Sequence, residues 1–200
     1  LIDLPKDITQ GPCQAAFVDE IDLPGYTIPA RGRPELIAAA AEKLQASKRP
    51  VLYIGNGAVI SGAGKAVVSL AEKLRAPLGN TLLGKGAADE THPLHLGMLG
   101  MHGTAYANKA VVDCDLIMAI GARWDDRITG KLDEFCIDAV KIHIDIDPAS
   151  INKVVPVDLG IVGDCAQVLE QMVAGWASRE PRDLGEWKAR IAGWKARKPC

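Results

Sequence analysis

Two arginines and two aspartates occur close together in this 200-residue sequence, at Arg123, Asp125, Asp126 and Arg127. They follow the apolar run 116–120, whose length and composition predict a buried β-strand. Ligands of an open α/β sheet bind at the carboxyl ends of its strands, where two guanidinium groups could bind a phosphate. The same spacing is equally consistent with an Arg–Asp network that only fixes a surface loop.

A glycine-rich turn provides a second candidate. Gly55, Asn56 and Gly57 follow the apolar run 51–54, and the segment 61–64 opens a helical pattern. Such a strand–turn–helix unit lets the backbone come close to a phosphate or a ring, and the helix N-terminus favours an anion. The spacing is not GxGxxG, so the turn does not indicate a standard NAD site.

Asp145 is a third candidate, near the end of the alternating segment 140–147. An acidic side chain at a strand end can accept a hydrogen bond from a ribose hydroxyl, as in dinucleotide-binding folds. A helix N-cap or a loop salt bridge explains the same residue equally well.

The segment 84–103 shows no clear periodicity and contains His92, His95 and His102, so we expect a functional loop there. The histidines lack metal-ligand spacing, and we predict no metal site. We also predict no catalytic residue, because no Ser/His/Asp, Cys/His or paired-carboxylate arrangement can be defended from spacing alone.

Strands and helices must position these candidates. We expect strands at 1–8, 51–54, 115–120, 140–147 and 154–162, and a strand with its exit at 76–83. We expect helices at 34–44, 61–74, 104–114 and 165–176, with an amphipathic helix after 178. Right-handed crossovers between such units predict an α/β fold with three α/β/α layers and a mostly parallel, Rossmann-like (doubly wound) sheet of about six strands.

Composition excludes several classes of function. A formal net charge of −2 argues against nucleic-acid and membrane-surface partners, and no apolar run is long enough to span a membrane. The five scattered cysteines predict reduced thiols in a cytoplasmic protein. The chain opens without Met in what reads as a strand, so we expect a piece of a longer protein.

Several segments of the sequence resemble the large, catalytic subunit of acetolactate synthase (acetohydroxyacid synthase), a thiamine-diphosphate-dependent enzyme. The likeness covers residues 1 to about 175, and it is carried by the segments 97–104 and 121–130, with further matches at 4–7, 23–26, 49–57 and 143–147.

The resemblance implies a domain organisation. Residues 1–10 would end a preceding pyrimidine-binding domain, 11–33 would be a linker, 34–178 the central FAD-binding-type domain, and 179–200 a helix or linker towards a diphosphate-binding domain. Thiamine diphosphate and Mg²⁺ would bind to those flanking domains, so we expect the isolated chain to be inactive.

The whole enzyme would condense pyruvate with pyruvate or 2-oxobutyrate, with loss of CO₂, in branched-chain amino-acid biosynthesis. It would be a homodimer or homotetramer, with or without a regulatory subunit. Two alternatives stay open. One is the central domain of another thiamine-diphosphate-dependent carboligase or decarboxylase, and the other is a ligand-free scaffold domain.

The resemblance also implies which residues contact FAD, whose role there is structural rather than redox. These are Arg31, Gly55, Asn56, Gly57, Thr81, Leu82, Leu99, Gly100, Met101, His102, Gly121, Ala122, Arg123, Asp125, Arg127, Ile128, Asp145, Ile146, Gly163 and Asp164. The residues Met101, Asp126 and Arg127 match positions at the entrance where inhibitory herbicides bind. Asn56 interrupts the glycine pattern common in the family, and Trp124 stands where the family often has Phe.

Overall fold

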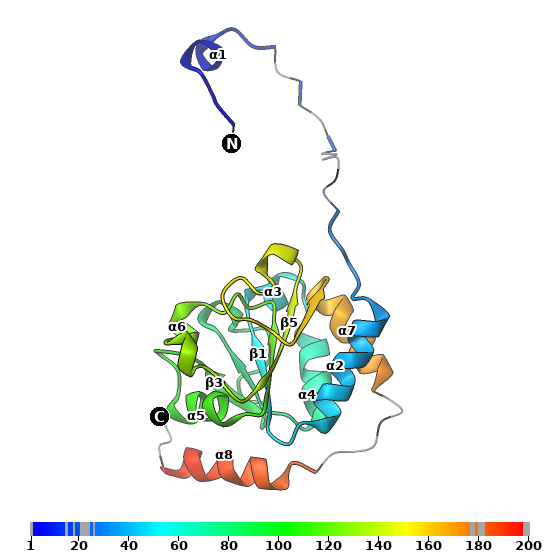
Figure 1. Cartoon of the computed structure of the whole chain (residues 1–200), viewed down its shortest axis with the longest axis vertical. Coiled ribbons are helices and arrows are strands. Elements are labelled where there is room, and N and C mark those ends of the chain that lie inside the picture. Colours follow the sequence, from blue (N-terminus) through cyan, green and yellow to red (C-terminus); the bar gives the residue numbers. More distant parts are fainter. Residues whose placement is uncertain are drawn as a thin grey trace.

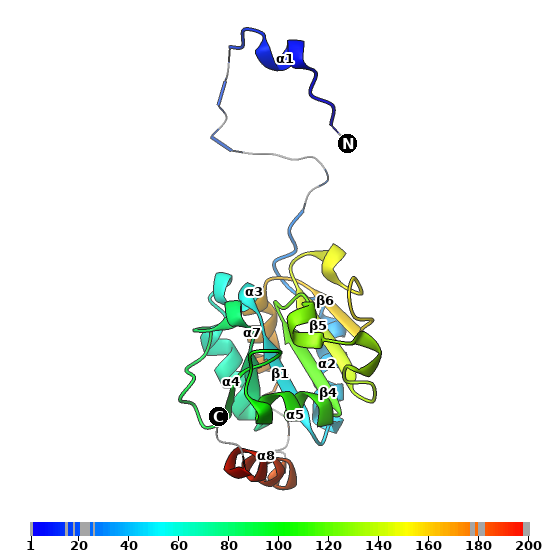
Figure 2. The same ribbon diagram turned by 90° about the vertical axis from the view of Figure 1, so that its left-hand side faces the viewer.

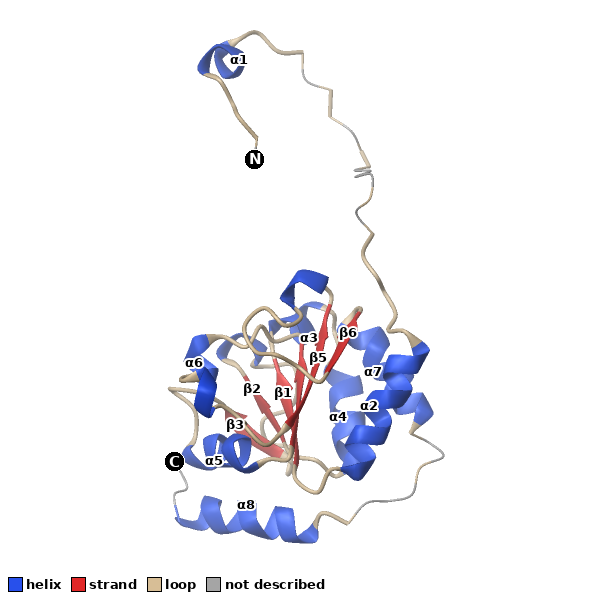
Figure 3. Cartoon of the chain, in the orientation of Figure 1, coloured by secondary structure: helices blue, strands red, loops and turns tan. Residues whose placement is uncertain are grey.

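The computed structural model describes residues 2–14, 16–17, 19–20, 25, 27–176, 179 and 183–197. Six parallel strands form one sheet in the order β3-β2-β1-β4-β5-β6 (Figures 1 and 3). The strands are β1 (Pro50–Ile54), β2 (Leu78–Asn80), β3 (His95–Met98), β4 (Leu116–Ile120), β5 (Val140–Asp145) and β6 (Leu159–Val162). The α/β fold with a parallel, doubly wound sheet is therefore confirmed.

Helices cover both faces of the sheet (Figures 1 and 2). Helices α2 (Pro34–Ala46), α4 (Gly64–Leu74) and α7 (Cys165–Gly175) pack on one face, with strand residues such as Leu52 and Ile54 in their core. Helices α5 (Ala105–Asp113) and α8 (Gly185–Arg197) share the opposite core with Val51 and Tyr53. Alternate residues of β1 thus face different cores, as the pleat requires.

The predicted helices form where local signals place them. A proline occupies the first turn of α2. Thr104 caps α5 by accepting from the N–H of Ala107 at 3.3 Å, and Asp164 caps α7 by accepting from the N–H of Gln167 at 3.1 Å. The amphipathic helix expected near the C-terminus is α8, in which Trp187 and Ile191 are buried.

Two strand predictions were wrong, one in type and one in extent. The segment predicted as a strand at 1–8 overlaps helix α1 (Lys6–Gln10) and has no strand in 2–8, since no described strand lies beside it (Figures 1 and 2). Leu1 lies outside the described residues, as does most of the matched segment 23–26. Strand β6 begins only at Leu159, after the apolar segment 154–157, whereas β2 lies within the predicted strand and exit at 76–83.

The region 84–103, expected to lack regular structure, contains the edge strand β3. The strand is only four residues long and includes a glycine with φ of +79°, so its sequence has no strand period to detect. Shorter elements were also missed: α3 (Asn56–Ile60), α6 (Asp126–Thr129), and the 3₁₀ turns η1 (Leu82–Gly84), η2 (Leu132–Glu134) and η3 (Pro148–Ser150). Among the described residues, no helix combines the length and apolar character needed to cross a bilayer.

Candidate functional site

The strand order reverses between β1 and β4. The chain runs outward from β1 through β2 to β3 and then returns to pair β4 with the other side of β1. The connections that follow β1 and β4 therefore start side by side and then lead away in opposite directions. At this point of an open parallel sheet, a crevice forms beyond the carboxyl ends of the strands. Gly55 follows β1 at this position, and Gly121 follows β4.

The two loops touch through their backbones. The N–H of Gly55 donates to the carbonyl of Ile120 at 2.9 Å, and the N–H of Gly57 donates to Gly121 at 3.0 Å. A Cβ on Gly55 would lie 2.1 Å from the carbonyl oxygen of Gly121, and one on Gly57 would lie 2.8 Å from Gly121 Cα. Gly121 itself has φ of +59°. Side chains at these positions would push the loops apart, so glycine is required.

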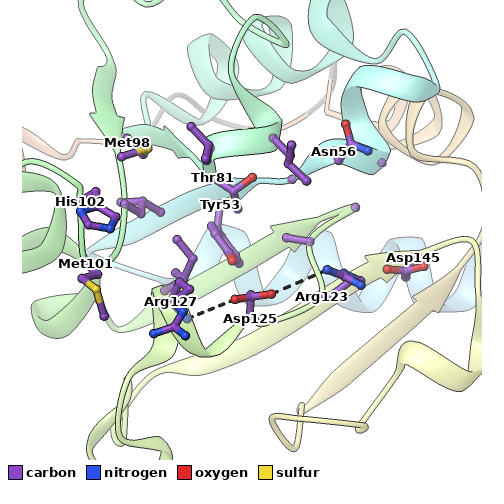
Figure 4. Close-up of a pocket in the computed structure, with 18 of the residues that line it drawn as sticks. Tyr53, Asn56, Thr81, Met98, Met101, His102, Arg123, Asp125, Arg127 and Asp145 are labelled. Carbon is purple, nitrogen blue, oxygen red and sulfur yellow. Dashed lines mark hydrogen bonds and ion pairs between the residues drawn. The ribbon is translucent and has the colours of Figure 1, made fainter.

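A cavity of about 970 Å³ opens above these loops (Figure 4). In the view of Figure 4, Met101 and His102 lie at one end, Asn56, Arg123 and Asp145 lie towards the other, and Asp125 lies between them. Most residues predicted to contact the cofactor line this cavity: Gly55, Asn56, Gly57, Thr81, Leu82, Leu99, Met101, His102, Gly121, Ala122, Arg123, Asp125, Arg127, Ile128 and Asp145.

The remaining predicted residues lie around the cavity without lining it. Gly100 packs behind it, where a Cβ would meet the carbonyl oxygen of Arg127 at 2.4 Å. Gly163 donates its N–H to the carbonyl of Asp145 at 3.0 Å, and Asp164 is the N-cap of α7. The other three, Arg31, Ile146 and Asp126, are exposed nearby.

Arg123 and Arg127 form the charged side of the cavity, together with Asp125 (Figure 4). Arg123 Nη2 lies 3.7 Å from Asp125 Oδ2, and Arg127 Nε lies 3.8 Å from Asp126 Oδ1. The backbone hydrogen bond from Arg127, then the Asp126 side chain, lowers the pKa of Asp125. The arginine side chains are 76% and 69% exposed. Exposed pairs at this distance are weak, so both guanidinium groups are available to a ligand anion.

Asp145 supplies a buried carboxylate at the other end. Burial disfavours its charged form, but the His143 side chain, 3.5 Å away, and the N–H of Asp147, at 2.9 Å, outweigh burial and lower the pKa of Asp145. The carboxylate is therefore ionised at neutral pH, and it can accept a hydrogen bond from a hydroxyl group of a ligand.

Sequence reasoning missed Tyr53, which lines the cavity from the penultimate position of β1. Its side chain is buried, and its hydroxyl has no hydrogen-bond partner among the described residues. Its ring packs on Trp124, with centroids 5.5 Å apart, and burial, followed by the nearby Asp125 charge, raises the pKa of Tyr53. The only signal in the sequence was a hydroxyl within an apolar run directly before a glycine loop.

The apolar side of the cavity was also only partly predicted. Ile60, Leu83 and Met98 line it, and no pattern in the sequence separates them from ordinary core residues. Leu82, Leu83 and Met101 are 67%, 64% and 64% exposed, so the mouth has an apolar rim. The arrangement combines exposed arginines and glycine loops with apolar walls, which suits a ligand with both a phosphate and a flat apolar group. Within the described part of the chain, no group of three or more His, Cys, Asp or Glu residues could hold a metal ion.

Comparison with known proteins shows clear relatives. Residues 37–172 match the family described as "Thiamine pyrophosphate enzyme, central domain". The chain is 46% identical to a "Probable acetolactate synthase large subunit" of Methanocaldococcus jannaschii over 95% of this chain and 33% of that protein. It is 45% identical to an "Acetolactate synthase large subunit" of Parasynechococcus marenigrum, over 100% of this chain and 33% of that protein.

A third relative is the "Acetolactate synthase large subunit" of Corynebacterium glutamicum, 40% identical over 100% of this chain and 32% of that protein. The chain thus spans about a third of the length of the curated relatives it matches.

Proposed function

We infer the function of this chain from its family, because the chain belongs to the thiamine pyrophosphate enzyme central domains. We propose that it is the central domain of an acetolactate synthase and that it binds FAD. In the whole enzyme, pyruvate would lose CO₂ and its two-carbon unit would be transferred to a second 2-oxo acid. The names of the relatives support this choice over another carboligase or decarboxylase.

The observation that carries FAD binding is the cavity at the contact between the β1 and β4 loops. Gly55 and Gly57 allow the two loops to meet through their backbones at Gly121, and all three glycines line the cavity, so a ligand there can approach the backbone. Arg123 and Arg127 would hold the pyrophosphate, and the buried carboxylate of Asp145 would accept a ribose hydroxyl. The apolar residues around Met101 would cover the isoalloxazine ring.

A flavin ordinarily supplies hydride transfer, but in the proposed enzyme FAD would have a structural role. The residues of this chain would bind and orient the cofactor, and none is proposed to act on the substrate. Thiamine diphosphate and Mg²⁺ would be held by other domains of the enzyme. We therefore expect this chain alone to form no acetolactate from pyruvate, even with thiamine diphosphate and Mg²⁺. Measurable product would refute that expectation.

Titration of FAD into the purified chain tests the proposal directly. We expect saturable binding, seen as a change in the visible absorption of the flavin. Arg123→Ala should weaken binding about tenfold without unfolding the domain, because it removes one charged contact. Arg190→Ala, at an ion pair with Asp113 outside the cavity lining, is the matched control and should bind as the unaltered chain does. If FAD does not bind at all, the domain is a ligand-free scaffold. If the Arg123 variant binds FAD with unchanged affinity, Arg123 does not contact the cofactor.

A further inference from the structure

Two glycines beside the cavity are each held by a single side-chain amide. Asn108 accepts from the N–H of Gly100 through Oδ1 and donates to its carbonyl through Nδ2, both at 2.8 Å. Gln171 accepts from the N–H of Gly32 through Oε1 at 3.0 Å and donates to its carbonyl through Nε2 at 3.1 Å. A primary amide carries one donor group and one acceptor side by side, so it matches both backbone groups of one residue.

Gly100 belongs to the segment 99–103, between β3 and α5, which contains no helix or strand. It has φ of +90°, and the next residue, Met101, donates its N–H to the carbonyl of Arg127 at 2.8 Å. Asn108 reaches this segment from α5, so the helix fixes the backbone that carries Met101 and His102 into the cavity. Met101 and His102 lie at one end of the cavity (Figure 4).

Gly32 belongs to the segment 27–33 before α2, which also has no regular structure. The carbonyl of Ala30 accepts from the N–H of Asp164 at 2.9 Å, and a Cβ on Gly163 would lie 3.2 Å from the carbonyl carbon of Arg31. Because Gly163 in turn donates to the carbonyl of Asp145, this segment places Arg31 beside the Asp145 end of the cavity. Gln171 holds the segment there from α7.

We propose that Asn108 and Gln171 are positioning residues that preorganise the two ends of the FAD site. This inference rests on the proposed function. Each amide belongs to a packed helix, and the two helices lie on opposite faces of the sheet. Each ties down a segment that would otherwise have to be ordered when the ligand binds. Ordering those segments in advance lowers the entropic cost of binding, which raises affinity without adding a contact to the ligand.

Asn108→Ala and Gln171→Ala test the inference in the full chain, with FAD as the probe. We expect each to weaken FAD binding about tenfold, because each removes two hydrogen bonds that hold a segment at or beside the cavity. The matched controls are Lys109→Ala and Gln167→Ala, exposed neighbours on the same helices, which should bind FAD normally. Asn108→Gln and Gln171→Asn keep both the donor and the acceptor of the amide and change only its reach, so they should weaken FAD binding less than alanine does, and they stand in for an alanine variant that fails to fold.

The flavin spectrum separates positioning from general loss of stability. Asn108→Ala should change the visible absorption and circular dichroism of bound FAD, because Met101 and His102 lie at the proposed flavin end. Gln171→Ala should lower affinity and leave that spectrum unchanged, because its segment lies at the opposite end. If the two substitutions only destabilised the domain, both would lower the temperature of thermal unfolding, and neither would change the spectrum of bound FAD.

Amide hydrogen exchange of the ligand-free chain completes the test. Exchange of the Gly100 and Gly32 amides should quicken in the respective alanine variants, because each amide loses its acceptor. Faster exchange with unchanged FAD affinity would overturn the inference while leaving the proposed function intact. Failure of the unaltered chain to bind FAD would overturn the proposed function itself.

Discussion

The two ends of the same parallel strands differ in how completely their polar groups are paired. At the amino edge, the carboxylate of Asp115 accepts hydrogen bonds from Ser47 and from the N–H groups of Lys48 and Arg49, the last at 2.9 Å. Helix α8 lies along this edge (Figure 1), where the indole N–H of Trp187 donates to the carbonyl of Pro50 at 3.2 Å.

At the carboxyl edge, the corresponding partners are missing. The hydroxyl of Tyr53 and the indole N–H of Trp124 are buried without a hydrogen-bond partner in the described part of the chain. Trp124 has φ of +57°, an unfavourable value for a bulky residue, and Met101 is 64% exposed. Unpaired buried groups are concentrated where a fold serves a ligand, while closed networks serve stability. The comparison therefore predicts that mutations at the amino edge change the free energy of unfolding, whereas mutations at the carboxyl edge change FAD affinity.

Trp187→Ala should have the largest effect on folding and none on ligand binding. The side chain is 2% exposed, and its removal leaves a cavity and an unpaired carbonyl at Pro50, so we expect a loss of about 3–5 kcal/mol in the free energy of unfolding. Urea denaturation measures the loss, and Trp194→Ala, at the partly buried neighbour in α8, should cost clearly less. If the folded variant binds FAD more weakly, the claim that the amino edge contributes only to stability is wrong.

Gly55→Ala should lower both the free energy of unfolding and FAD affinity, because Gly55 lies at the contact between the loops that follow β1 and β4. Its Cβ would lie 2.1 Å from the Gly121 carbonyl oxygen, which only a backbone shift can relieve. We expect a loss of about 2–3 kcal/mol in stability and of roughly 100-fold or more in FAD affinity. Gly175→Ala is the control, since a Cβ there meets nothing within 4 Å. Normal FAD binding by the Gly55 variant would show that the loop contact does not shape the site.

Asp115→Asn should remove a pH-dependent part of the stability at the amino edge. Burial raises the pKa of Asp115, but the hydrogen bonds from Ser47, Lys48 and Arg49 outweigh burial and lower it. A depressed folded-state pKa means that this stability is fully present above the unfolded value near pH 4 and is lost as the pH falls through the folded-state pKa.

For a partly exposed carboxylate, we expect Asp115→Asn to cost about 1–2 kcal/mol at pH 7 and less as the pH falls. Unfolding curves between pH 7 and about pH 3 measure this difference. A cost that stayed constant across that range would show that the charge of Asp115 is not what stabilises the edge. FAD affinity at pH 7 should not change.

Tyr53→Phe should have the smallest effect on folding. It deletes a buried hydroxyl that has no partner, so stability of the ligand-free chain should stay the same or rise by up to about 1 kcal/mol. If a bound ligand satisfies the hydroxyl, FAD affinity should fall about fivefold. A marked loss of stability without ligand would mean that the hydroxyl is already paired, which would weaken the contrast between the edges.

The local parts of this structure could be predicted from the sequence. The apolar runs at β1 and β4, the proline that starts α2 and the capping residues Thr104 and Asp164 each act through neighbours a few residues away. The resemblance in the segments 97–104 and 121–130 identified the family correctly. The predicted cofactor residues largely surround one cavity, but their contact with FAD stays a prediction.

Other parts depend on long-range contacts. Strand β3 is too short to show a period, and it exists because β2 offers a parallel edge for pairing. The segment 2–8 contains apolar residues suited to a strand but has no partner strand, and part of it is helical. Periodicity reports which face of an element is apolar, not which neighbour will pair with it.

The sequence by itself thus determined the longer helices, the strands β1, β4 and β5, the glycines at the strand ends and the family. Only the tertiary structure decided that β4 returns beside β1, which brings Gly55 against Gly121 and opens the cavity. It also decided that Gln171 binds Gly32 across 139 positions and that Tyr53 is buried without a partner. The physical reason is that capping and periodicity act within a few residues, whereas strand order and polar pairing are set by packing of the whole chain.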